Sequence, residues 1–134
     1  YAGSISVGQT CVANSAIKTT SGDIILSANN DITNYGTIDS SGAATLTAGT
    51  SGSIDNNNAI KAGAGITMNA GAAINNSNSG SGSVSSTSGD ISMTAGTSIT
   101  NDAVTASAGS VSMTASGGSI TNNGAVQANG DSSS

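Results

Sequence analysis

Few side chains in this chain could perform acid–base or metal chemistry. It has seven acidic residues, all aspartates, together with two lysines, one cysteine and no histidine. Nucleophilic catalysis needs a base such as His, Lys or a tuned carboxylate beside Ser or Cys. No serine lies in a G-x-S-x-G context. The chemistry left to consider is glycoside hydrolysis by a carboxylate pair and cation binding by oxygen ligands.

Two pairs of aspartates deserve comparison with glycosidase carboxylates. Asp23 and Asp90 occupy matching positions of a repeat described below, three coils apart. Their separation would be about 14 Å, beyond the roughly 5–9.5 Å of glycosidase pairs. Asp31 and Asp55 fall on adjacent coils and could approach more closely, but no aromatic residue or arginine stands nearby to hold a sugar. We therefore expect no enzyme activity and no catalytic residue.

Metal and cofactor sites find little support in the sequence. The sequence has no cluster of thiolate or imidazole ligands that could bind zinc. Asp55-Asn56-Asn57-Asn58 and Asn101-Asp102 are oxygen-rich, but Asn and Asp also populate turns for local backbone reasons. We expect no metal and no cofactor. The single Cys11 cannot form an intramolecular disulfide, which leaves an inert thiol or an intermolecular bridge.

Charge and hydropathy limit the class of partner. The net charge is −5, and Lys18 and Lys61 are the only basic residues, which argues against nucleic acid and against docking on an anionic membrane. No apolar run approaches the roughly 20 residues needed to span a bilayer, so we expect no membrane insertion. No signal peptide is visible, and a start at Tyr1 suggests a processed form or a fragment. The Ser/Thr/Asn-rich composition favours a secreted, extracellular protein.

The elements that would position these residues are short strands in a repeat. From Ser21 to Ser40, apolar residues alternate with polar ones, break at turns and resume, as in half-buried strands. The pattern predicts one all-β domain over 1–134, a parallel β-solenoid of about six coils with three short strands per coil and roughly 20–25 residues per coil. The expected coils cover residues 3–20, 21–41, 42–62, 63–88, 89–108 and 109–129, followed by a short polar tail at 130–134.

Each coil has three recurring apolar elements. The first is an apolar pair: Ile5/Val7, Ile24/Leu26, Ala44/Leu46, Ile66/Met68, Ile91/Met93 and Val111/Met113. The second is an apolar residue followed two places later by Asn: Val12/Asn14, Ile32/Asn34, Ile54/Asn56, Ile74/Asn76, Ile99/Asn101 and Ile120/Asn122. The third is a single apolar residue: Ile17, Ile38, Ile60, Val84, Val104 and Val126. The longest coil carries an insertion, Ser77 to Ser83, expected to protrude as a loop.

The recurring Asn should point inward, because it shares parity with the inward Ile two residues before it. A buried amide must be hydrogen-bonded. We therefore predict a ladder in which each amide bonds the ones above and below, formed by Asn14, Asn34, Asn56, Asn76, Asn101 and Asn122. A ligand site built from these amides is the alternative.

Register also predicts a column of charges on the outer surface. Lys18, Asp39 and Lys61 each follow the apolar residue of the third element in consecutive coils. Facing opposite charges on a sheet contribute roughly 0.2–1 kcal/mol. We interpret the column as a feature that fixes register rather than as a binding site.

Three segments carry a resemblance to a known family. GDIILSANNDITNYGTIDS (22–40), GDISMTAGTSITND (89–102) and GSVSMTASGGSITNNGAVQA (109–128) resemble filamentous-haemagglutinin-type repeats. The resemblance extends over nearly the whole chain, from Gly3 to Asn129. It implies a right-handed parallel β-helix and an extracellular, adhesive or filamentous role, as in surface exoproteins of two-partner secretion. It carries over no catalytic residue, and the chain is far shorter than those exoproteins, with no visible amino-terminal secretion domain.

The ends of such a stack would leave strands unpaired and apolar columns exposed. Neither end of the sequence offers a capping helix, so the chain is either a piece of a longer solenoid or a subunit that stacks on copies of itself. The residues expected at the assembly ends are Ile5, Val7, Val12, Val111, Met113, Ile120 and Val126, with Ile5/Val7 meeting Val111/Met113.

Three functions follow from this architecture. The first is a structural subunit of an extracellular filament, with the chain itself as partner. The second is a segment of a surface adhesin that binds host or matrix glycans. The third is ice binding by outward threonines such as Thr45, Thr47, Thr67 and Thr94.

Overall fold

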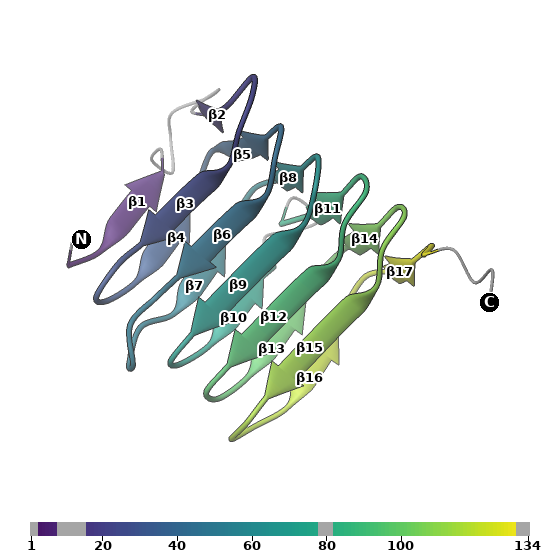
Figure 1. Ribbon diagram of the computed structural model, residues 1–134. Helices are drawn as coiled ribbons and strands as arrows, with labels where there is room; N and C mark the ends of the chain where they lie inside the picture. Colours follow the sequence, from purple (N-terminus) through teal and green to yellow (C-terminus); the bar gives the residue numbers. More distant parts are fainter. Residues whose placement is uncertain (1–2, 8–15, 78–81, 131–134) are drawn as a thin grey trace.

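The chain folds as a parallel β-solenoid (Figure 1). The computed structural model describes residues 3–7, 16–77 and 82–130. Its seventeen strands form three sheets, and every pairing between neighbouring strands is parallel. A full coil visits the three sheets in a fixed order, which we label I, II and III.

The sheets differ in their number of strands. Sheet I has five: β3 (Ile24–Ser27), β6 (Ala44–Thr47), β9 (Ile66–Ala70), β12 (Ile91–Ala95) and β15 (Val111–Ala115). Sheet II has six: β1 (Ile5–Val7), β4 (Ile32–Asn34), β7 (Ile54–Asn56), β10 (Ile74–Asn76), β13 (Ile99–Asn101) and β16 (Ile120–Asn122). Sheet III also has six: β2 (Ala16–Lys18), β5 (Thr37–Ser40), β8 (Ile60–Ala62), β11 (Val84–Ser86), β14 (Val104–Ala106) and β17 (Val126–Ala128).

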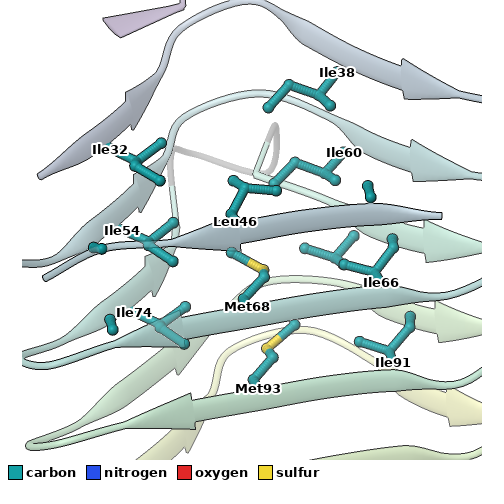
Figure 2. Packing of buried hydrophobic residues seen from close by; sticks show 14 of the residues in the cluster. Ile32, Ile38, Leu46, Ile54, Ile60, Ile66, Met68, Ile74, Ile91 and Met93 are labelled. Carbon is teal, nitrogen blue, oxygen red and sulfur yellow. The ribbon is translucent and has the colours of Figure 1, made fainter. Parts of the chain in front are cut away.

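The interior consists of columns of similar side chains, one from each coil. Alternation along each strand sends every second residue inward, and in-register pairing places it on its counterpart in the next coil. Met68 pairs with Leu46 on one side and with Met93 on the other. Figure 2 shows this column beside the isoleucine columns of sheets II and III. The side chains of these columns are fully buried in the middle coils, so the hydrophobic effect holds each coil to its neighbours rather than to itself.

The structure corrects the predicted first coil. Ile5–Val7 was expected to begin the column of Ile24/Leu26, but β1 lies in sheet II, where Ile5 pairs with Ile32 and Val7 with Asn34. The sequence Ile-x-Val fits either sheet, because the inward–outward period is the same in both. The described part of the first coil therefore contributes strands to sheets II and III only. Val12, Asn14 and Cys11 lie outside the described residues.

The turns also stack closely, and glycine makes this possible. At the corner between sheets I and II, Gly96 lies over Gly71 and donates its N–H to the carbonyl of Ala70 at 3.0 Å. An added Cβ at Gly96 would lie only 1.9 Å from the carbonyl oxygen of Gly71. A side chain at this position would force two coils apart.

We expect Gly96→Ala to lower the free energy of unfolding by about 1–3 kcal/mol, the usual cost of overpacking. Chemical denaturation of the purified chain measures the change. Gly3→Ala is the matched control, because an added Cβ there meets only the side chain of Asn30 at 3.6 Å, an ordinary contact. Equal stability of the two variants would show that the corners do not stack as described.

Candidate functional site

Buried asparagines of sheet II form hydrogen-bonded rungs along the stack. Asn34 donates its Nδ2 to Asn56 Oδ1 at 2.7 Å. Asn76 donates to Asn101 Oδ1 at 2.8 Å, and Asn101 donates to Asn122 Oδ1 at 3.0 Å. Four of these five side chains have no exposed surface, while Asn122 is exposed at the end of the stack. Where one amide bonds the next, the pair links successive coils in register.

The ladder is interrupted between Asn56 and Asn76. Asn56 donates instead to the carbonyl of Ser83 across 3.5 Å, and Asn76 Oδ1 is buried with no hydrogen-bond partner. The strand register also ends here, because β10 pairs with β7 through Ile74 and Ile54 and through Asn75 and Asp55. Gly82 packs against both backbones: an added Cβ there would lie 2.7 Å from the carbonyl oxygen of Asn56 and 2.8 Å from the carbonyl carbon of Asn76. Among the described rungs, this is the least satisfied point of the ladder.

The ladder does not continue from Asn34 toward the amino terminus as predicted. The residue paired with Asn34 on that side is Val7. The Oδ1 of Asn34 accepts the backbone N–H of Gly36 at 3.2 Å. Within the described residues, the amide ladder therefore begins at Asn34.

The predicted charge column lies on the outer surface of sheet III. Lys18 is opposite Asp39, and Asp39 is opposite Lys61. Lys18 Nζ lies 3.3 Å from Asp39 Oδ2. Lys61 forms no ion pair in the part of the chain that the structure describes. Because the Lys18 side chain is 64% exposed and that of Asp39 is 38% exposed, the pair contributes about 0–1 kcal/mol.

Aspartates clamp consecutive coils at their turns, a role that the sequence reasoning missed. Asp23, Asp31 and Asp90 each accept a backbone N–H one coil further on, from Ala43, Ser53 and Ser110, at 2.8 Å in every case. The two members of each pair are 20 to 22 residues apart, the length of about one coil, and this spacing could have indicated the contact. These three carboxylates therefore link the backbones of successive coils.

Asp31 and Asp55, the pair that could have approached across adjacent coils, bond different partners. Asp31 clamps Ser53, while Asp55 Oδ1 accepts the side-chain amide of Asn75 at 2.7 Å. No group of three or more potential His, Cys, Asp or Glu metal ligands occurs among the described residues.

The clamp at Asp90 is expected to make the stability of the fold depend on pH. Hydrogen bonds from the backbone N–H and then the hydroxyl of Ser110 lower the pKa of Asp90 below its ordinary value of 3.8. A carboxyl with a lowered folded-state pKa stabilises the fold above its unfolded pKa and loses that contribution as the pH falls through the folded value. We expect the melting temperature to decrease as the pH is lowered below about 4. The Asp90→Asn variant should have a lower melting temperature at pH 7, and that temperature should change less with pH than in the unsubstituted chain. A variant whose melting temperature follows the same pH dependence as the unsubstituted chain would contradict the clamp.

The carboxy-terminal end of the described stack exposes inward-facing side chains. In the last coil Ile120 is 41% and Val126 is 40% exposed, and Val111 and Met113 of β15 are half-buried. These residues belong to the columns that are fully covered two coils earlier. At the other end, Ile5, Ile17 and Leu26 are half-buried, while Val7 is buried.

The corrected register changes which end residues match. Ile5 and Val7 were predicted to meet Val111 and Met113 of a neighbouring copy. Because β1 belongs to sheet II, the strand in line with Ile5–Val7 at the far end is β16 (Ile120–Asn122).

The outer face of sheet I is polar and regular. Two outward rows run along it, Ile25, Thr45, Thr67, Ser92 and Ser112, and Ser27, Thr47, Asn69, Thr94 and Thr114. Ile25 is the exception, with 72% of its surface exposed.

No helix among the described residues is long and apolar enough to cross a membrane. Comparison of the chain with protein families, with curated proteins and with solved structures finds no match.

Proposed function

We propose that this protein is a structural subunit of an extracellular filament that grows by end-to-end stacking of β-solenoids. The observation that carries the proposal is the exposure of Ile120 and Val126 in the last described coil, in columns that are buried in the coil before. The edge strands β15, β16 and β17 also offer backbone donors and acceptors on their outer sides. A head-to-tail contact that does not close on itself produces a filament.

The match between the two ends supports the same proposal. Sheets II and III extend through the described stack without a change of direction, ending in β1 and β2 at one end and in β16 and β17 at the other. Placing β16 on β1 sets Ile120 against Ile5, and placing β17 on β2 sets Val126 against Ile17. Like residues then continue like columns, as they do inside the chain.

Sedimentation and negative-stain microscopy of the purified chain over a range of concentrations test the proposal. Stacking predicts a critical concentration, above which unbranched fibres one solenoid wide appear. A chain that stays monomeric at every concentration would contradict it.

The joint differs from the interior of the stack at one rung. Asn122 would lie against Val7 instead of another Asn, so its Nδ2 would leave water without gaining an amide acceptor, at a cost of about 1–3 kcal/mol. We expect Val7→Asn to lower the critical concentration by about tenfold. Ser6→Asn, on the outer face of the same strand, is the control. A critical concentration raised by Val7→Asn would show that Val7 and Asn122 do not meet.

A role as a segment of a surface adhesin is the second candidate. The resemblance of residues 22–40, 89–102 and 109–128 to filamentous-haemagglutinin-type repeats favours it, as do the rows of hydroxyl and amide side chains on the outer face of sheet I. A glycan array and a cell-binding assay with the monomeric chain test it. Monomers that bind glycans and never form fibres would favour the adhesin over the filament.

A further inference from the structure

The corner between sheets II and III carries a reactive pair of residues in one coil. Asn123 and Gly124 lie between β16 and β17, directly after Asn122 of the amide ladder. Asn129-Gly130 is the only other Asn-Gly pair in the chain. An asparagine amide can react with the backbone nitrogen of the next residue, and a glycine, which has no Cβ, lets that nitrogen approach most closely. Whether the folded chain permits the reaction depends on solvent access and on the hydrogen bonds of the corner.

Water reaches this corner in several coils. The residue that follows the ladder asparagine is half-buried at Tyr35, Asn57 and Asp102, although a further coil follows each of them, and it is exposed at Ser77. Asn123 is exposed as well. The accessibility of position 123 is therefore a property of the corner and does not depend on which coil of the stack it occupies.

The nitrogen that would react is not held by a hydrogen bond. Asn123 donates its own N–H to the carbonyl of Asn101 at 2.8 Å, which fixes the backbone on the preceding coil. The N–H of Gly124, in contrast, forms no hydrogen bond with any residue that the structure describes. An added Cβ at position 124 would lie 2.3 Å from the carbonyl oxygen of Asp102, so the close stacking of this corner requires a glycine. The same packing that selects glycine leaves its nitrogen unshielded beside the asparagine.

We propose that Asn123 is a site of spontaneous deamidation in the folded chain. The Gly124 nitrogen attacks Cγ of Asn123, and the new N–Cγ bond forms as the Cγ–Nδ2 bond breaks. Nδ2 leaves as ammonia, taking the proton that the Gly124 nitrogen gives up. One water then opens the resulting succinimide ring, which yields aspartate when the N–Cγ bond breaks and isoaspartate when the original peptide bond breaks.

The product places two carboxylates on neighbouring coils at the same corner. Asn122 pairs with Asn101, so residue 123 follows in register on Asp102, about 4.8 Å away. Like charges that lie directly opposite each other on neighbouring strands are destabilising. Deamidation therefore adds a negative charge to a chain of net charge −5 and weakens the contact between these two coils. The modification is a slow chemical switch that acts on one corner of the stack.

Peptide mapping by mass spectrometry after incubation at mildly alkaline pH tests the site. Conversion is followed at each asparagine in the folded chain and in denaturant, because the ratio of the two rates removes the effect of the local sequence. We expect denaturation to speed conversion less than about tenfold at Asn123 and more than about 100-fold at Asn76, whose side chain has no exposed surface. Protection at Asn123 as strong as that at Asn76 would overturn the proposal. Aspartate without isoaspartate would indicate direct hydrolysis and contradict attack by Gly124.

A second measurement tests the consequence for stability. Asn123→Asp reproduces the charge of the product and should lower the melting temperature by about 1–4 °C, a difference that added salt should reduce. Asn129→Asp is the matched control, because Ala128 pairs with Ala106 and position 129 therefore follows in register on Ser107 rather than on a carboxylate. It should change the melting temperature by less than about 1 °C. An equal decrease in both variants, or none in Asn123→Asp, would overturn the facing carboxylates.

Discussion

Replacing Asn101 by Leu is expected to destabilise the fold more than any other single change in the ladder. Asn101 is fully buried, accepts from Asn76 and donates to Asn122. Asn101→Leu would leave the buried Nδ2 of Asn76 with only the weak contact that it makes to Met93 Sδ at 3.6 Å. An unsatisfied buried donor costs about 1–3 kcal/mol, and with the lost bonds themselves the total is about 2–4 kcal/mol.

Two companion variants separate the ladder from general packing. Thr100→Ala changes the neighbouring outer-face residue and should cost less than about 0.5 kcal/mol. Asn76→Leu should cost less than Asn101→Leu, because it also removes a buried oxygen that has no partner. Denaturant unfolding of the three variants gives the order. A larger loss of unfolding free energy in Asn76→Leu than in Asn101→Leu would contradict the interruption of the ladder between Asn56 and Asn76.

Introducing a charge at Ile120 is expected to weaken assembly strongly without unfolding the subunit. Ile120 lies in the core-facing column of the last coil, paired with Ile99, and is 41% exposed. In a stacked pair it would be covered by Ile5 of the next copy. Ile120→Lys removes the apolar contact and would bury an unpaired ammonium group. We expect the critical concentration to rise at least about 100-fold.

The neighbouring residue supplies the matched control for this variant. Thr121 is on the same strand with opposite parity, opposite Thr100 on the outer face. Thr121→Lys adds the same charge and should leave both assembly and melting temperature nearly unchanged. Sedimentation above the wild-type critical concentration compares the two. Equal loss of assembly in both would indicate that net charge, rather than the covered column, controls stacking.

Much of the fold could be predicted from the sequence because every coil repeats the same pattern of inward and outward residues. Ile54 and Ile74 align because each precedes an inward Asn by two residues, and the same counting placed Lys18, Asp39 and Lys61 opposite one another. This periodic spacing can be recognised in a single sequence because each coil has the same geometry.

The errors lie where a local period does not distinguish between alternatives. Ile5-Ser6-Val7 alternates like a strand of sheet I and like a strand of sheet II, and only its partner in the next coil decides between them. The interruption at Asn76 lies where the pairing of β10 with β7 ends, at Asn75 and Asp55. The clamp at Asp90 depends on a backbone N–H twenty residues away. Each of these features is a contact between coils, which spacing within a coil does not specify.

End-to-end stacking is the central claim, and helical reconstruction of the assembled chain by electron cryo-microscopy tests it most directly. We predict one subunit per six coil spacings, an axial rise of about 29 Å, with strands of sheets II and III continuing across the joint at the same spacing as inside the subunit. Filaments built from contacts between the sides of solenoids, with β16 and β1 far apart, would contradict it.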